Sequence, residues 1–510
     1  MSQSLTRPAT TAPTRFEEAA DGWRRTWVRP RVQAWVLAAV FFAAYCAISV
    51  RRHQRMQSTG YDLGIFEQAI RAYAHGRLPV TPLKGPGFDL LGDHFHPLLV
   101  VFAPFYRLFP TPLTLLVGQA ALTAVAVVPL VLWAHRVRGP KASAWVGLSF
   151  GASWGLAEMI HFDFHEVCLA VPLLAFALAA AGQQRWRAAA LWGLPLLLVK
   201  EDLGLTLAVL GGYIAWRGPK RLGWSLAAAG LLGSALEMLV ILPSVNSGGS
   251  FDYWNEISSG GTVAVPGHHL SLVPTALHFF WPPVKYWTVL MLLAPTGFLA
   301  LRSPLVLLLL PTLGWRFISA NPSYFGTSEH YSAVLMPVVF AAAIEAMDRD
   351  RAVLDARRLR RRMALGVAVT VGTLPLHPLV ELVEPGTWTT SAHVRTAARI
   401  LRLIPDGATV AATNRLVPQL TARDTVTLIC QQTPPPPEPP QWVLADDTDP
   451  TKFPCPMPQI TAEVAADQSS GEYRLVTRQD GITLLELNPL SPLNRWTPEP
   501  ATPQRRQTTP

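Results

Sequence analysis

The chain has 510 residues, of which half are hydrophobic and only 15% are charged, and its formal net charge is +9. This composition excludes a soluble protein of several domains, because apolar runs of nearly twenty residues recur between residues 32 and 382. The positive charge does not indicate nucleic-acid binding, since the basic residues cluster in short loops between the apolar runs, as the positive-inside rule describes. We therefore expect a mainly α, polytopic transmembrane helical bundle.

The N-terminal segment, residues 1–31, is polar and rich in arginine, which argues against a cleavable signal peptide and places the segment in the cytoplasm. The first apolar run, at about residues 32–50, then anchors the chain and leaves the loop after it outside. Arg51, Arg52 and Arg55 follow on that outer side, against the rule. They are interpreted either as interfacial anchors or as contacts to a phosphate group.

The first external loop, residues 51–112, begins with a short helical pattern. Apolar residues recur at helical spacing between Leu63 and Tyr73, with polar residues opposite, which predicts an amphipathic helix lying on the membrane. Thr59 and Asp62 have the spacing of its capping box. Glu67 lies on the polar face, where we expect it to be solvated.

The apolar run at residues 97–110 decides the orientation of everything after it. It is shorter than a span and contains three prolines. If it does not cross, the basic loop at 135–141 is cytoplasmic, and so are the later basic loops; if it crosses, all of them lie outside. The first alternative is preferred. It gives about eleven spans within a transmembrane domain of residues 32–383, although the turn KED at 200–202 forms either a hairpin tip or a break within one helix.

The C-terminal region, residues 384–490, replaces long apolar runs with short alternating ones. The order of strand, helix, strand, another strand and a hairpin predicts a small extracytoplasmic α/β domain. Cys430 and Cys455 are either a disulfide or two free thiols. The tail at 491–510 is expected to be disordered, and the proline-rich stretch from Thr433 is a stiff linker.

This topology gathers acids and histidines from several turns on the outer side, whereas the cytoplasmic loops hold mainly Arg and Lys. The pattern predicts a cavity at the membrane surface, although external loops are polar in any membrane protein. The candidate site residues are Asp62, His94, His96, Asp163, His165, Glu166, Lys200, Glu201, Asp202 and His330.

Each candidate has a structural and a functional interpretation. Asp62 is either a helix cap or a general base that deprotonates an acceptor hydroxyl. Lys200 either neutralises its two acidic neighbours or holds a phosphate. The histidines, with their adjacent carboxylates, suit either a divalent metal ion or hydrogen bonds to a polar ligand and helix ends. No cofactor is indicated beyond that possible metal.

The order YDLGIFEQ, GDHFHP, PFYRLFP, FDFHE, KEDLGL and SEHY resembles a family of bacterial predicted membrane proteins of unknown function, related to the GT-C superfamily of integral membrane glycosyltransferases. The resemblance covers about residues 55–430. It implies a polyprenyl-phosphate-linked sugar donor, an acid in the first external loop that acts as base, and juxtamembrane helices in that loop. Asp62 matches the acid, residues 97–110 match a juxtamembrane helix, and Lys200 matches the lysine of a turn after a short span. The loop here has one Asp where many relatives have an adjacent acidic pair.

The leading hypothesis is a glycosyltransferase on the extracytoplasmic face of the bacterial plasma membrane, acting on a glycan, lipid or protein acceptor. Asp62 is its base, Lys200 and either Arg51 or Arg52 hold the donor phosphate, and the His-rich turns position sugar or acceptor. The alternative from another class is a transporter or lipid flippase, which requires polar residues and broken helices near the midplane. The candidates for such positions are Glu237 and the KED turn. A scaffold or sensor is a third hypothesis and leaves the acidic face unexplained.

Overall fold

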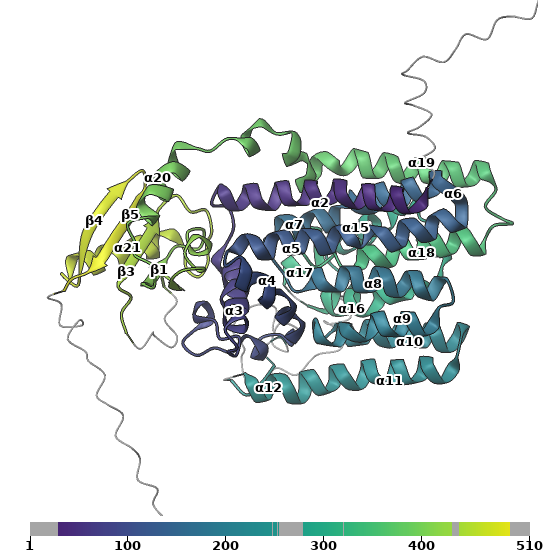
Figure 1. Cartoon of the computed structure of the whole chain (residues 1–510), viewed down its shortest axis with the longest axis horizontal. Helices are drawn as coiled ribbons and strands as arrows, with labels where there is room; N and C mark the ends of the chain where they lie inside the picture. Colours follow the sequence, from purple (N-terminus) through teal and green to yellow (C-terminus); the bar gives the residue numbers. More distant parts are fainter. Residues whose placement is uncertain are drawn as a thin grey trace, which may run out of the picture.

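A helical bundle and a small α/β domain at one end of it make up the chain, as the computed structural model shows (Figure 1). The structure describes residues 29–246, 248–251, 253, 279–319, 321–430 and 438–489. Most of the N-terminal segment, residues 254–278, most of the proline-rich linker and the tail at 491–510 lie outside these residues.

The bundle contains helices of very different lengths. They are α2 (Pro30–Gln54), α5 (Pro112–Val125), α6 (Val127–Gly151), α7 (Trp154–His161), α8 (Val167–Gly182), α9 (Trp186–Gly193), α10 (Leu203–Arg217), α11 (Lys220–Leu236), α12 (Leu242–Val245), α15 (Val284–Leu293), α16 (Leu310–Ile318), α17 (Pro322–Phe325), α18 (Leu335–Arg349) and α19 (Ala356–Thr373). Within α6 the helix breaks sharply at Gly139, whose φ is +79°, and Pro140 follows it. This break falls in the basic loop that the sequence predicts.

Three stretches of the described helices are long and apolar enough to cross a membrane: Pro30–Gln54, Pro112–His161 and Lys220–Val245. Other apolar helices are shorter, with 10–17 residues, and some of them include a proline-led 3₁₀ turn such as η5 (Leu194–Leu198). The mainly helical membrane fold is therefore confirmed, whereas the number of about eleven spans stays a prediction.

The first loop folds into short helices at the end of the bundle. A π-helical turn, η1 (Gly60–Gly64), leads into α3 (Ile65–Ala74), which runs across the bundle end rather than along it (Figure 1). Next come η4 (Pro97–Phe102) and α4 (Ala103–Leu108), of six residues each. Together they extend about 20 Å, less than the roughly 30 Å of a bilayer core, so this segment is too short to cross by itself.

The α/β domain has a five-stranded sheet in the order β2-β1-β3-β5-β4. Its elements are α20 (Ala392–Leu401), β1 (Thr409–Ala412), β2 (Thr425–Leu428), β3 (Trp442–Asp446), α21 (Met457–Ser469), β4 (Tyr473–Gln479) and β5 (Ile482–Leu487). Strands β1, β2 and β3 are parallel, and the hairpin β4–β5 pairs antiparallel with β3. The predicted strands are present, α20 and α21 were not predicted, and Cys430 and Cys455 form a disulfide.

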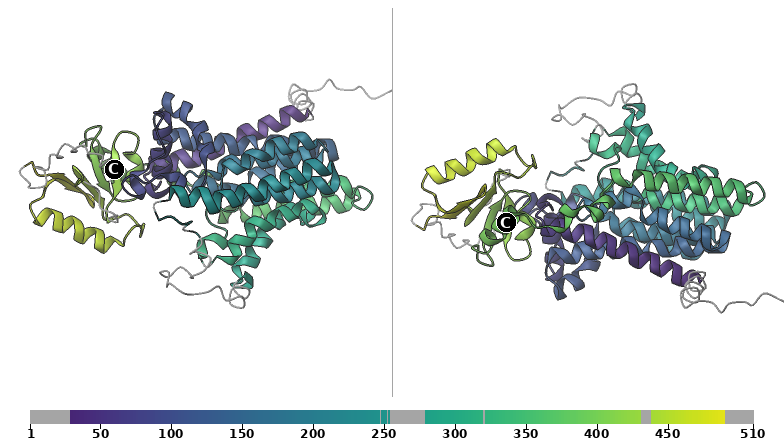
Figure 2. Two further views of the ribbon diagram at one scale, coloured as in Figure 1. Left: turned by 90° about the horizontal axis from the view of Figure 1, so that it is seen from below. Right: turned by 90° about the horizontal axis from the view of Figure 1, so that it is seen from above.

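The α/β domain lies on the polar face of α3, beyond the first loop in both views of Figure 2. Glu67 is fully buried, and its carboxylate accepts hydrogen bonds from Tyr106 Oη, at 2.8 Å, and from the Thr421 hydroxyl. Gln68 and Arg71 donate to backbone carbonyl groups of the domain at 2.9 Å. The prediction of a solvated Glu67 was wrong, because a domain more than three hundred residues away in sequence covers it.

Candidate functional site

A cavity of about 390 Å³, here called the polar pocket, lies at the end of the bundle that faces the α/β domain. Nine of the predicted site residues line it: Asp62, His94, His96, His165, Glu166, Lys200, Glu201, Asp202 and His330. Aromatic side chains complete the wall: Tyr61, Phe66, Phe162, Phe251, Tyr253, Trp315, Tyr324 and Tyr331. Turns far apart in the sequence thus converge on one cavity, as their chemistry suggested.

Asp62 reaches the pocket from the π-helical turn η1. Gly60 allows the close approach of the α/β domain there, because a Cβ atom at this position would lie 2.5 Å from the Val417 side chain. The Asp62 carboxylate accepts a hydrogen bond from Thr59 Oγ1 at 3.2 Å and lies 3.4 Å from His165 Nε2. Because Thr59 N donates to Asp163 and not to Asp62, the expected capping box does not form.

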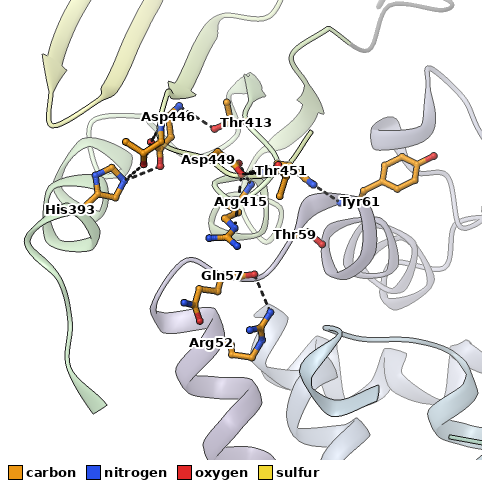
Figure 3. A network of polar contacts seen from close by, with 12 residues as sticks. Arg52, Gln57, Thr59, Tyr61, His393, Thr413, Arg415, Asp446, Asp449 and Thr451 are labelled. Carbon is orange, nitrogen blue, oxygen red and sulfur yellow. Dashed lines mark hydrogen bonds and ion pairs between the residues drawn. The ribbon is translucent and has the colours of Figure 1, made fainter. Parts of the chain in front are cut away.

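Asp163 and Arg52 do not line the pocket, and the substrate-binding role predicted for them stays a prediction. The Asp163 carboxylate accepts hydrogen bonds from Thr59 N at 2.8 Å and from Thr59 Oγ1 at 2.9 Å. The Arg52 guanidinium lies 2.6 Å from His161 Nε2 and donates to the Gln57 carbonyl at 3.5 Å (Figure 3). Both residues therefore fix the segment that carries Asp62 from behind the pocket wall.

Three pocket histidines are buried and have unused ring nitrogens. The rings of His165 and His330 stack with centroids 3.6 Å apart. Each follows closely after a non-glycine residue with positive φ, Asp163 at +63° and Glu329 at +67°, a conformation common at functional sites. The Nδ1 atoms of His96, His165 and His330 have no hydrogen-bond partner among the described residues.

Burial determines the charge of these imidazoles. It lowers the pKa of His96 and of His165 to about 4, and it lowers the pKa of His330 well below its ordinary value. The three rings are therefore neutral at pH 7. Each ring then has one nitrogen that donates and one that accepts hydrogen bonds.

Lys200 and Glu166 form a buried ion pair, with Nζ and Oε1 2.8 Å apart. Burial alone would raise the pKa of Glu166, but Lys200 and the neighbouring histidines outweigh it and hold that pKa well below its ordinary value. Burial would lower the pKa of Lys200, but Glu166, Glu201 and Asp202 raise it. Lys200 therefore remains a cation in the pocket. Its direct ion-pair partner is Glu166, 34 residues earlier, and not its sequence neighbours Glu201 and Asp202.

The two acids that follow Lys200 also have partners elsewhere. Glu201 Oε1 lies 2.7 Å from His94 Nδ1, and Glu201 Oε2 accepts from the Phe95 amide at 3.1 Å. Asp202 Oδ2 accepts from Trp315 Nε1 at 2.9 Å, and burial raises the pKa of Asp202 to about 6. The interpretation of KED as a self-neutralising cluster was therefore wrong.

Asp62 is the pocket carboxyl with the most strongly raised pKa. Burial raises it to about 8, and the nearby Asp163 charge adds to the shift, against the hydrogen bond from Thr59. At pH 7 most molecules then hold a protonated Asp62 beside a neutral His165. A carboxyl with a pKa near the working pH suits a group that accepts and releases a proton during reaction.

Arg316 is a buried charged residue beside the pocket turns that the sequence interpretation missed. It is fully buried and donates to the Tyr324 carbonyl, to the Gly326 carbonyl at 3.1 Å and to Ser332 Oγ at 3.2 Å. These acceptors flank the turn that presents His330. A charged residue inside the apolar run at 304–318 was the signal that could have identified it.

Other missed residues are Lys84, Tyr253 and Trp315. Lys84 Nζ lies 2.7 Å from Asp93 Oδ2, the Tyr253 ring stacks on His94 at 4.4 Å, and Trp315 holds Asp202. No group of three or more His, Cys, Asp or Glu side chains among the described residues is arranged to hold a metal ion. The divalent metal stays a prediction.

An apolar groove of about 620 Å³ lies beside α4 and α5. Its lining includes Val101, Phe105, Phe109 and Val117, and it exposes almost no polar surface. Phe102, which also lines it, packs edge-on against Phe164 at 5.2 Å, and Phe164 packs against Phe66 at 5.5 Å. Phe66 in turn lines the polar pocket. An aromatic wall therefore separates the groove from the pocket.

The sequence matches a family described as "Predicted membrane protein (DUF2079)" over residues 52–484. This match begins within α2 and ends within β5, so it includes the polar pocket and the α/β domain. A comparison with curated proteins finds no match.

Proposed function

The chain belongs to this family of predicted membrane proteins, and from that premise we propose that it is an integral membrane glycosyltransferase. It moves a sugar from a polyprenyl-phosphate-linked donor to an acceptor hydroxyl on the extracytoplasmic face of the plasma membrane. The observation that carries the proposal is Asp62, a buried carboxyl with a pKa of about 8, which shares one cavity with the cation Lys200. The GT-C resemblance of the motif order agrees with this assignment.

The proposed reaction is a single displacement. The Asp62 carboxylate takes the proton of the acceptor hydroxyl, and the acceptor oxygen forms a bond to the anomeric carbon. The bond from that carbon to the phosphate oxygen breaks, and the polyprenyl phosphate leaves with the electron pair. Neutral His165, 3.4 Å from Asp62, is placed to orient the carboxyl and to pass its proton on.

Lys200 stabilises the charge that develops on the leaving phosphate. Its ammonium group faces Glu166 at 2.8 Å in the free protein, so the phosphate adds a second anion to a cation that is already fixed in position. Arg52 lies behind the wall and contributes through Asp163 and Thr59 rather than by direct contact. His94, His96 and His330 supply hydrogen bonds to the sugar or the acceptor.

The apolar groove beside α4 and α5 supports a lipid-linked donor. A polyprenyl chain needs an apolar surface close to the reacting phosphate, and the groove lies on the other side of the aromatic wall formed by Phe102, Phe164 and Phe66, whose inner face lines the polar pocket. A soluble nucleotide sugar would gain nothing from it. The groove and the pocket together support a lipid-linked donor.

One feature favours a transporter or lipid flippase instead. Glu237 is buried in the apolar stretch Lys220–Val245, at the start of the π-helical turn η6 (Glu237–Ile241). Its Oε2 atom has no hydrogen-bond partner within the part of the chain that the structure describes. Buried acids at helix irregularities are frequent along transport pathways.

Turnover of lipid-linked sugars in membranes separates the two functions. Membranes containing wild type, Asp62→Asn or Glu237→Gln are compared at equal expression, together with Asp348→Asn, an exposed acid far from the pocket, as the matched control. A glycosyltransferase loses turnover in Asp62→Asn and keeps it in the other two. Equal turnover in all four samples contradicts the transferase, and loss of lipid or solute movement in Glu237→Gln alone supports the transporter.

A further inference from the structure

A second cavity, of about 210 Å³, lies between the α/β domain and the end of α2; we call it the interdomain cleft. It is lined by Arg55, Met56, Gln57, Gly386, Thr389, Ser391, His393, Val394, Arg415, Asp446, Thr448, Asp449 and Pro450. None of these residues belongs to the polar pocket. Figure 3 shows Arg415 extending from the α/β domain toward Gln57, with His393 and Asp446 on one side.

The cleft lies at the topological switch point of the parallel part of the sheet. Strand β1 has β2 on one side and β3 on the other, so the loops that leave the carboxyl ends of β1 and β3 diverge. The loop after β1 carries Arg415, and β3 ends at Asp446. Open α/β sheets bind ligands in the crevice between such loops.

The carboxylates of the cleft are fully engaged within the domain. Asp446 Oδ2 lies 2.9 Å from His393 Nε2, and Asp446 Oδ1 accepts from the Thr448 amide and hydroxyl at 2.9 and 2.7 Å. Asp449 accepts from the Arg415 amide at 2.9 Å and from Thr451 N and Oγ1 at 2.9 and 2.8 Å. These acids have little capacity left for a ligand.

The guanidinium groups are not engaged in the same way. Arg415 Nε is 3.9 Å from Asp449 Oδ1, too far for a hydrogen bond, and this buried atom has no partner among the residues that the structure describes. Within the same residues, the Arg55 side chain makes no hydrogen bond or ion pair. The first turn of α20 adds the positive end of a helix dipole, with Ser391 Oγ capping the Val394 amide.

From this arrangement we infer that the interdomain cleft is a second ligand site, which binds a phosphate group between Arg55 and Arg415 at the N-terminus of α20. Two guanidinium groups from different domains supply the paired donors that a phosphate accepts. The Thr389 and Thr448 hydroxyls beside them suit a hydroxyl-bearing ligand, such as a phosphorylated sugar or a lipid headgroup. This inference does not rest on the proposed transfer reaction.

Occupancy of the cleft acts on the pocket through a shared wall. Gln57 faces the cleft, and Tyr61 and Asp62 face the polar pocket. Asn414, next to Arg415, accepts hydrogen bonds from the Gly60 amide at 2.8 Å and from the Tyr61 amide at 3.1 Å. A phosphate that bridges the two arginines therefore stiffens the segment that carries Asp62.

Binding to the purified full chain in phosphatidylcholine nanodiscs tests the inference without any measurement of turnover. The probes are inorganic phosphate, glucose 6-phosphate and a short-chain phosphatidic acid, and titration calorimetry measures each affinity. Arg55→Gln and Arg415→Gln should each weaken binding by about tenfold or more, since each removes a charge-assisted contact. Arg402→Gln, at the exposed end of α20, is the matched control and should bind like wild type.

Hydrogen exchange supplies an independent measurement. The bound probe should slow amide exchange at 56–62 and 413–416 in wild type and not in Arg55→Gln, whose side chain makes no hydrogen bond or ion pair within the described residues, so that its loss leaves the fold intact. Tighter binding of the lipid probe identifies a headgroup, and tighter binding of the soluble ester identifies a free phosphorylated sugar. Absence of binding by all three probes, or equal affinity in wild type and both cleft variants, overturns the inference.

Discussion

The Asp62 carboxylate lies 3.4 Å from His165 Nε2, so a carboxyl with a pKa raised to about 8 faces an imidazole with a pKa lowered to about 4. Burial shifts both groups toward their neutral forms, and neither is charged in most molecules at pH 7. The carboxyl therefore holds the proton, and the imidazole does not take it up. That balance underlies the first prediction.

Turnover should rise with pH and level off above about pH 8. The base must be ionised to accept the acceptor proton, and raising the pH through the Asp62 pKa ionises it. Below that pKa the rate should increase about tenfold per pH unit. Asp62→Asn should reduce turnover by roughly 10² to 10⁴-fold and abolish this rise. A pH profile that is flat between 6 and 8 in wild type contradicts the role of Asp62.

Removing one partner of the Lys200–Glu166 pair should cost more stability than removing both. Lys200→Met leaves the Glu166 carboxylate, whose side chain is 1% exposed, without its counter-ion and should lower the free energy of unfolding by about 3 to 5 kcal/mol. Lys200→Met combined with Glu166→Gln should recover most of that loss. Thermal unfolding in detergent measures it. As a control, Arg358→Met, which breaks an exposed pair with Asp355, should cost at most about 0.5 kcal/mol.

Arg316→Lys should loosen the turn that presents His330. A lysine ammonium cannot reach the Tyr324 carbonyl, the Gly326 carbonyl and Ser332 Oγ together, and each buried acceptor left unpaired costs about 1 to 3 kcal/mol. Amide exchange across 322–332 should therefore accelerate. Arg302→Lys, in an exposed pair with Asp350, is the control. Unchanged exchange in Arg316→Lys would show that the turn is held by other contacts.

Docking of the α/β domain should weaken as the pH rises from 4.5 to about 7. Burial raises the Glu67 pKa from 4.5 to about 7, against hydrogen bonds from Thr421 and Tyr106, so ionisation is less favourable in the docked state than in the unfolded chain. The contribution of protonated Glu67 to stability is complete below pH 4.5 and decreases as the pH rises to about 7. In Glu67→Gln the unfolding temperature should no longer decline over this pH interval. In the exposed control Glu384→Gln it should decline as in wild type. A wild-type unfolding temperature that does not change across this interval excludes Glu67 as the cause.

The sequence was sufficient to identify most of the polar pocket, because its residues are polar groups at the ends of apolar runs, where burial of charge is costly. Nine candidates meet in one cavity for that reason. The pairing of those residues was not predictable. Lys200 contacts Glu166, 34 residues away, and Glu201 contacts His94, 107 residues away, and periodicity carries no information about such distances.

Helix patterns were predictable and their surroundings were not. The amphipathic pattern of α3 was correct, yet its polar face meets a protein domain and not water or lipid headgroups. Arg316 and Trp315 were missed because they lie within an apolar run that is typical of a span. A buried charge becomes recognisable as a turn-holding group only when the carbonyl groups around it are known.

The contact between Glu67 and Thr421 joins residues 354 positions apart. During synthesis the ribosome releases the first loop long before the α/β domain that covers it. The segment carrying Asp62 therefore lacks its contacts with the α/β domain until that domain has emerged from the ribosome and folded. A chain that stops before Thr421 will contain every residue of the polar pocket and still lack the contacts that hold its wall.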